Sequence, residues 1–199
     1  MKNLDEELLE LSEAEISRYA RHISLPQVGI SGQSKLKESS VLCIGAGGLG
    51  SPLLLYLAAV GVGRIGIIDY DLVEESNLQR QVIHSIDCLG NTKTSSAKER
   101  IIKINPYCQV DIYSFPLTNL NALDLIGRYQ VVCDCTDNFP SRYLINDACI
   151  ILGKPYVYGS IQAFQGQVTV FNLCPETSPN YRDLVPHPPP LELIPSCSE

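Results

Sequence analysis

The sequence predicts an α/β protein with a Rossmann-like, doubly wound, mostly parallel sheet that turns antiparallel near the C-terminus, with an N-terminal helical segment. Short apolar segments alternate with helical segments from residue 40 to 160, and a glycine-rich turn joins the first such pair. The last two strand-like segments follow each other with no helix between them. A helical crossover joins parallel strands, whereas directly linked strands pair antiparallel.

Local signals place each element in order. Residues 5–23 are expected to be helical, with a helix beginning at residue 13, because Ser12 and Glu15 have capping-box spacing. A loop rich in Gly, Ser and Gln follows over 25–35. Strands are expected at 40–44, 64–69, 109–115, 130–135, 156–160 and 167–172, and further helices at 52–60, 92–104, 122–127 and 140–152.

Three segments are expected along the chain: the N-terminal helical segment 1–35, a central domain 36–173, and a segment over 174–199. The last contains seven prolines between residues 174 and 197. Proline lacks the backbone N–H that helices and central strands need. We therefore expect this segment to form neither helix nor central strand and to cross the molecule in an extended conformation.

Composition excludes several classes of protein. Of the 199 residues, 45% are hydrophobic and 19% charged, which argues against disorder. A net charge of −7 argues against a nucleic-acid partner bound through bulk charge. No apolar run is long enough to span a membrane, and the acidic N-terminus does not resemble a secretory signal. We expect a cytoplasmic protein whose eight cysteines are thiols, with a disulfide framework as the alternative.

Three glycines predict a phosphate-binding turn. Gly45, Gly47 and Gly50 follow a strand and begin a helix, and Asp69 ends the next strand. Glycines allow the backbone to approach a phosphate, and the helix N-terminus offers free N–H groups. The alternative is a glycine turn used only for helix–sheet packing. NAD, FAD and ATP all remain open at this point.

Residues beyond the second strand favour a triphosphate. Residues 76–81 read Ser-Asn-Leu-Gln-Arg-Gln, and Lys93 begins a helix. Arg80 and Lys93 have the charge to neutralise β- and γ-oxygens, and Asn77 has an amide to donate. Asp137 and Asn138 follow another strand at its carboxyl end, where Asp137 is suited to Mg²⁺. The alternative is that Arg80 and Lys93 are ordinary surface charges.

Together these motifs resemble the ubiquitin-activating-type adenylyltransferases, of the kind that serve molybdopterin synthase and thiamine thiocarboxylate. The matching segments are GAGGLGS, DYDLVEESNLQRQ, the Lys93 helix, DCTDN and GSIQAFQGQVTVF. The resemblance implies a homodimer that uses ATP and Mg²⁺ to adenylate the C-terminal Gly-Gly carboxylate of a small ubiquitin-fold sulfur carrier, releasing pyrophosphate. The implied nucleotide-contacting residues are Gly45, Gly47, Gly48, Gly50, Asp69, Ser76, Asn77, Leu78, Gln79, Arg80, Lys93, Asp137 and Asn138.

The resemblance also assigns two residues outside these motifs. Arg21 matches an arginine that enters the partner subunit's site, and Cys197 matches a cysteine that can link covalently to the carrier or its sulfur; a solvated charge and an inert thiol are the alternatives. Where relatives have a zinc-binding thiolate pair, this chain has Asn180 and Asp183, so we expect no zinc. The chain also resembles the first part of a longer protein, in which a rhodanese domain for sulfur transfer would follow.

Two other classes of function compete with this interpretation. A nicotinamide oxidoreductase would also use the glycine-rich turn and Asp69, but it leaves residues 76–81 and 135–138 unexplained. A non-catalytic binding subunit with the same fold would not need Arg80, Lys93 and Asp137 together. Whether the carrier serves molybdopterin, thiamine or tRNA thiolation stays open.

Overall fold

The computed structural model describes residues 10–174 and 177–188. Its centre is a six-stranded sheet in the order β3-β2-β1-β4-β5-β6, in which only β5 and β6 pair antiparallel. The strands are β1 Ser40–Ile44, β2 Arg64–Ile68, β3 Gln109–Tyr113, β4 Val131–Asp134, β5 Tyr156–Gln162 and β6 Gln165–Phe171. The predicted fold class, including the antiparallel end of the sheet, is confirmed.

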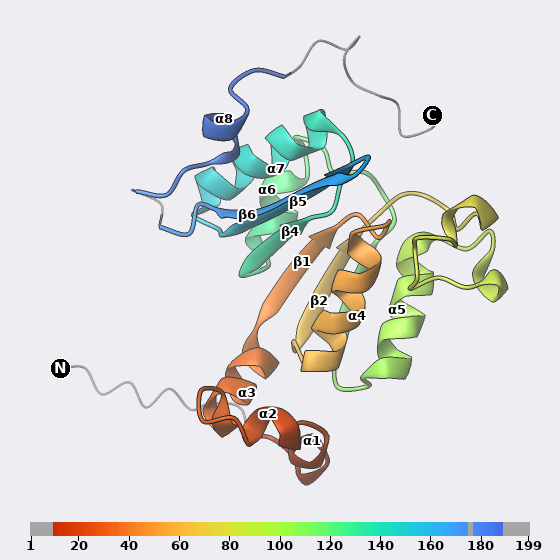
Figure 1. Ribbon diagram of the computed structural model, residues 1–199, viewed down its shortest axis with the longest axis vertical. Coiled ribbons are helices and arrows are strands. Elements are labelled where there is room, and N and C mark those ends of the chain that lie inside the picture. Colours follow the sequence, from red (N-terminus) through yellow and green to blue (C-terminus); the bar gives the residue numbers. More distant parts are fainter. Residues whose placement is uncertain (1–9, 175–176, 189–199) are drawn as a thin grey trace.

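Helices cover both faces of this sheet (Figure 1). Helices α4 and α5 lie over one face, α6 and α7 lie over the other, and α1 to α3 lie at the end where β1 begins. The helices are α1 Glu13–Arg18, α2 Ala20–Ile23, α3 Gly29–Glu38, α4 Gly50–Val60, α5 Lys93–Ile104, α6 Ala122–Gly127, α7 Phe139–Leu152 and α8 Tyr181–Leu184, with 3₁₀ turns at Glu75–Asn77 and Ile86–Cys88. None of the helices in the described part of the chain is long and apolar enough to cross a bilayer.

The period-two alternation of the strands creates two hydrophobic cores. In β1, Val41 and Cys43 pack in the cluster that contains residues of α4 and α5. Their neighbours Leu42 and Ile44 pack on the opposite face with residues of α6 and α7. Because successive side chains of a strand point to opposite faces, an apolar run such as residues 40–44 is buried on both sides.

The expected loop over residues 25–35 is wrong, because most of it belongs to helix α3, which also crosses the expected segment boundary at residue 35. Gly and Ser have low helix propensity, but tertiary contacts override it here. The fully buried Gln33 donates from Nε2 to the carbonyl of Val60 at 2.9 Å, which satisfies the C-terminal end of α4. The N–H of Gly63 donates to the carbonyl of Leu36, which fixes α3 beside the sheet.

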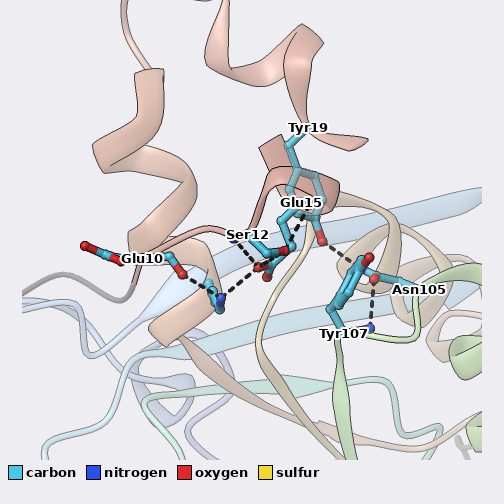
Figure 2. Close-up of polar contacts among 7 residues, drawn as sticks. Glu10, Ser12, Glu15, Tyr19, Asn105 and Tyr107 are labelled. Carbon is cyan, nitrogen blue, oxygen red and sulfur yellow. Dashed lines mark hydrogen bonds and ion pairs between the residues drawn. The ribbon is translucent and has the colours of Figure 1, made fainter. Parts of the chain in front are cut away.

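Helix α1 begins with the predicted capping box and is tied to the domain by side chains (Figure 2). The Glu15 carboxylate accepts hydrogen bonds from Ser12 and lies 2.9 Å from the Lys37 ammonium. Asn105, just after α5, donates to the Tyr19 hydroxyl at 2.7 Å (Figure 2). The N-terminal helices are therefore part of the domain and pack at the end of the sheet away from the strands' carboxyl ends.

The expectation that residues 174–197 form no helix is also wrong, within the part that the structure describes. Helix α8 spans one turn, Tyr181–Leu184, between Pro179 and Pro186. Asn180 caps it: its side chain accepts from the N–H of Arg182, and its own N–H donates to Asp183 at 2.8 Å. The prolines lie outside this turn, where they do not interrupt its hydrogen bonds.

Gly66 in β2 is the residue whose lack of a side chain matters most for packing on the α6/α7 face. A Cβ atom there would lie 2.4 Å from the Tyr129 ring and 2.8 Å from Leu42. The Tyr129 hydroxyl donates to Asp111 at 3.0 Å, so the ring cannot move without loss of this bond. The tyrosine therefore fills the space that a side chain at residue 66 would occupy.

We predict that Gly66→Ala lowers the free energy of unfolding by about 1–3 kcal/mol, the usual cost of overpacking a core. Chemical denaturation measured by circular dichroism would test this. Gly127→Ala is the matched control, because nothing lies within 4 Å of the added methyl and alanine favours helix. Equal stabilities of the two variants would contradict the packing argument.

Candidate functional site

A cleft of about 640 Å³ lies at the carboxyl ends of β1, β2 and β4. This is the edge at which open α/β sheets bind ligands. Its lining comes from the turn after β1, the loops after β2 and β4, the first turns of α5 and α7, and one residue each after β3 and in β5. The lining residues are Ile44, Gly45, Gly47, Gly48, Leu49, Ile68, Asp69, Tyr70, Asp71, Asn77, Arg80, Gln81, Lys93, Leu117, Cys135, Thr136, Asp137, Asn138, Ser141, Arg142 and Ile161.

The glycines of the turn after β1 divide into two kinds. Gly45 has a φ of +97°, and a Cβ there would lie 2.7 Å from the carbonyl oxygen of Cys135. A Cβ at Gly50 would lie 2.0 Å from the carbonyl oxygen of Gly45, so both glycines serve close backbone packing. A Cβ added at Gly47 would meet only the Gln81 side chain, and one added at Gly48 only the Arg80 side chain, at 3.6 Å or more in both cases. The packing alternative therefore explains Gly45 and Gly50 but not the open surface at Gly47 and Gly48.

Two side chains hold this turn from opposite sides of Ala46. The Asp69 carboxylate accepts from the N–H of Ala46 at 2.8 Å and from the N–H of Asp71 at 2.9 Å. His84 contacts the Ala46 carbonyl through Nε2 at 3.1 Å and the Ser96 hydroxyl through Nδ1 at 2.9 Å. A carbonyl only accepts, so Nε2 carries the proton and Nδ1 accepts from Ser96.

Burial lowers the pKa of His84 below its ordinary value and nearby Lys93 adds to this, while the hydrogen bond to Ala46 and the charge of Asp69 oppose the shift. The sequence had suggested no role for this histidine. Its function here is structural: it positions the glycine-rich turn from behind. No spacing rule connects residue 84 to residue 46, so the contact appears only in the folded chain.

Lys93 and Arg80 provide positive charge on the β2 side of the cleft. The Lys93 side chain is buried, and its ammonium lies 2.7 Å from the Asp71 carboxylate, while its N–H donates to the Asp71 carbonyl. Arg80 is exposed and donates to the carbonyl of Ser76 at 3.2 Å. Lys93 is therefore not an ordinary surface charge, whereas Arg80 extends from an exposed loop into the cleft lining.

The loop after β4 is organised by Asp134, the last residue of that strand. It is 1% exposed and accepts from the Tyr156 hydroxyl at 2.6 Å and from both the N–H and the hydroxyl of Thr136. Burial raises the pKa of Asp134 above its ordinary value, and these hydrogen bonds oppose the shift. Next along the chain, Asp137 is exposed in the cleft, and Asn138 caps α7 by accepting from the N–H of Ser141.

The cleft brings together most of the predicted nucleotide-contacting residues from five separate segments. Five predicted residues of the described chain do not line it: Gly50, Ser76, Leu78, Gln79 and Arg21. Arg21 lies in α2, at the opposite end of the sheet from the cleft (Figure 1). Cys197 lies outside the described residues.

Sequence reasoning missed two buried polar residues of the cleft lining. Gln81 is buried, and its Oε1 has no hydrogen-bond partner within the described structure. Its place directly after the Ser-Asn-Leu-Gln-Arg run is the sequence signal that could have identified Gln81 as a cleft residue. Arg142 is also buried at the cleft, three residues into α7. The only sequence signal for Arg142 was its position one helical turn after Asn138, and such a spacing is common in sequences.

Asn180 and Asp183, the two residues on which the expectation of no zinc rests, are joined to each other. The Asn180 side-chain amide and backbone N–H both donate to the same Asp183 oxygen at 2.8 Å. These two residues thus form the capping box of α8. The expectation of no zinc stays a prediction.

Comparisons with known proteins agree with this arrangement. The chain is 53% identical over 194 residues to a probable adenylyltransferase/sulfurtransferase MoeZ of Mycobacterium tuberculosis, covering 95% of this chain and 49% of that protein. It is 50% identical to a sulfur carrier protein adenylyltransferase of Thermus thermophilus, covering 93% of this chain and 69% of that protein. Among solved structures, E. coli MccB crystallised with ATP matches with 28% identity and a TM-score of 0.63, covering 72% of this chain and 45% of that one.

The chain therefore spans about half the length of the MoeZ relative that it matches. The sequence model of the ThiF family matches residues 19–199, which is most of the chain and includes every segment of the cleft. The fold, the cleft and this match together show that the chain belongs to the ThiF family.

Proposed function

We propose that the whole protein is an ATP-dependent adenylyltransferase that activates the C-terminal Gly-Gly carboxylate of a ubiquitin-fold sulfur carrier. The observation that carries this proposal is the convergence of Lys93, Arg80 and Asp137 on one cleft around the open glycines of the turn after β1. The names of the relatives, which include a sulfur carrier protein adenylyltransferase, support the same activity. The carrier would serve molybdopterin synthesis, with thiamine or tRNA thiolation as alternatives, and we expect the protein in the cytoplasm.

The cleft residues suit a nucleoside triphosphate. Gly47 and Gly48 offer an approach for phosphate oxygens, because only the side chains of Gln81 and Arg80 lie near their open face, at 3.6 Å or more from an added Cβ. Lys93 and Arg80 neutralise phosphate charge, and Asn77 and Asn138 offer amide donors. Asp137 would hold Mg²⁺, which proteins usually bind through one or two carboxylates together with substrate phosphates.

The reaction joins two anions, so the protein's main task is to place them and screen their repulsion. A carrier carboxylate oxygen attacks the α-phosphorus of ATP, the bond to the β-phosphate oxygen breaks, and an acyl-adenylate and pyrophosphate result. Lys93 is already oriented for this by Asp71, at 2.7 Å, so little reorganisation is needed. No proton transfer is required in this step, and no histidine is among the described residues that line the cleft.

The first test is substrate choice. The full-length protein should catalyse ATP–pyrophosphate exchange only when the carrier is present, and NAD should neither bind tightly nor compete. Isotope exchange with labelled pyrophosphate, combined with NAD titration by calorimetry, measures both. Tight NAD binding without exchange would favour the oxidoreductase instead, and binding of the carrier without exchange would favour a non-catalytic subunit.

We predict that Arg80→Ala and Lys93→Ala each slow the carrier-dependent exchange by about 10²-fold or more, the scale of losing one transition-state donor. Arg128→Ala is the matched control, because Arg128 is paired with Asp124 on the exposed surface and lies outside the cleft lining. Exchange at the wild-type rate in both cleft variants would show that these cations take no part in the reaction.

We also propose that the protein is a homodimer in which Arg21 enters the partner subunit's cleft. At the level of sequence, only the resemblance assigns Arg21 this role, and the loop expected after its helix is largely replaced by helix α3. What supports the proposal now is distance: Arg21 and the cleft of its own chain lie at opposite ends of the sheet (Figure 1). A two-fold axis can bring such an arginine to the other subunit's site.

Mixing full-length Arg21→Ala and Arg80→Ala chains, each inactive alone, would test this arrangement. If Arg21 acts across the dimer, each mixed dimer contains one intact site. Random mixing makes about half the dimers mixed, so about a quarter of wild-type exchange should return when the sites act independently. With subunit exchange verified by mass spectrometry, no recovery would mean that Arg21 acts within its own chain or not at all.

A further inference from the structure

Arg142 is a buried arginine at the cleft. It is 8% exposed and lies in the first turns of α7, with its guanidinium 5.2 Å from the centre of the Phe139 ring and 5.6 Å from that of Tyr158. One amino group, Nη2, donates to the carbonyl of Thr136 at 3.2 Å. These contacts fix the direction of the planar guanidinium before any ligand arrives.

Arg142 has no direct ion pair in the described part of the chain, although the buried Asp134 lies near enough for the arginine's charge to lower the pKa of that carboxyl. Lys93 and Arg182, in contrast, each form an ion pair with an aspartate. The nearby buried Asp134 uses both of its oxygens for Tyr156 and Thr136. The Nε atom of Arg142 is also buried without a hydrogen-bond partner.

A buried charge without a direct ion pair is costly, so it is rarely kept without a use. A guanidinium with free donors, held between two aromatic rings at a ligand cleft, matches a planar anion that accepts two parallel hydrogen bonds. A carboxylate is such an anion. Arg142 therefore lacks the partner that a substrate carboxylate would supply.

Arg142 lies on the other side of the cleft from Lys93 and Arg80, the two cations proposed to face the phosphates. Lys93, Asp69 and Arg80 follow β2, whereas Arg142 follows β4 and faces Tyr158 of β5. Strands β2 and β4 flank β1 on opposite sides, with the glycine-rich turn between them. The cleft lining on the Arg142 side includes Ile161 of β5, beside which a peptide tail has apolar surface to contact.

We propose that Arg142 binds the C-terminal carboxylate of the sulfur carrier and holds it beside the α-phosphate, an inference that rests on the proposed adenylation activity. A tail ending in Gly-Gly has no side chains to recognise, so its terminal carboxylate is the strongest feature that the cleft can bind. Pairing with Arg142 also lowers the repulsion between this carboxylate and the triphosphate.

The test compares two forms of one carrier: the same organism's ubiquitin-fold sulfur carrier with its natural C-terminal carboxylate, and the same protein ending in a carboxamide. Binding to the full-length enzyme is measured by calorimetry in the presence of a non-hydrolysable ATP analogue. We expect wild type to bind the carboxylate form about 10-fold or more tightly, as for hydrogen bonds to a charged group. Arg142→Gln should remove this preference, and Arg142→Lys, which keeps the charge but not the fork, should restore part of it.

The carboxamide carrier and the ATP analogue serve as internal controls, because both should bind Arg142→Gln as they bind wild type. Arg182→Gln is the matched variant: its guanidinium also lies over a tyrosine ring, at 4.8 Å from Tyr143, but it is exposed and paired with Asp147. This variant should keep the full preference. A loss of preference that appears only together with a lower melting temperature and weaker binding of the carboxamide form would mean a purely structural role, which overturns the proposal.

Two further results would overturn it. In the first, Arg142→Gln still prefers the carboxylate form of the carrier. In the second, Arg142→Gln loses affinity for the ATP analogue while its preference between the two carriers is unchanged, which would mean that Arg142 binds a phosphate. These results are distinct from failure of the adenylation proposal itself. That failure would appear in wild type as no carrier-dependent ATP–pyrophosphate exchange.

Discussion

The close approach of the glycine-rich turn to the end of β4 is the constraint on which the rest of the site depends. The chain leaves β1 and passes so near Cys135 that no side chain fits at Gly45, and it then folds back so tightly that none fits at Gly50. This path points the first turn of α4 at the cleft and brings the loops after β1 and β4 into contact. The open glycines, the exposed Asp137 and the buried Arg142 share one cleft because these two loops meet.

Buried polar groups then hold this geometry. Asp69 and His84 bond to the N–H and the carbonyl of Ala46, and Asp134 performs the same task for the loop after β4 through Thr136. Each of these groups is satisfied by the protein, so its cost of burial is offset. Among the described residues, four buried side chains have a polar atom without a hydrogen-bond partner: Ser51, Gln81, Arg142 and Tyr181. Of these four, Gln81 and Arg142 line the cleft.

Positively charged side chains lie on two opposite sides of the cleft. Lys93 and Arg80 lie on the β2 side, where the open glycines suit a triphosphate, and Arg142 lies on the β4 side next to β5. Two anionic substrates that repel each other would each meet a cation on their own side. Their reacting atoms would then meet over the glycine-rich turn, where the helix N-terminus also favours negative charge. The strand order of the sheet therefore determines where each cation lies, because it sets which loops lie on either side of β1.

The sequence by itself determined the features that depend on neighbouring residues. The capping box at Ser12, the left-handed glycines Gly61 and Gly153 at helix ends, and the apolar alternation of the strands act over a few positions, so reading the chain locally was enough to predict the sheet and most helices. The glycine-rich turn and Lys93 were found in the same way. Only the tertiary structure decided the features that depend on distant residues. Helix α3 forms because Gln33 meets the end of α4, His84 acts because it meets Ala46, and Arg142 faces the cleft because two rings hold it there. Such contacts join positions up to tens of residues apart and carry no fixed spacing, which is why the chain must fold before they can be recognised.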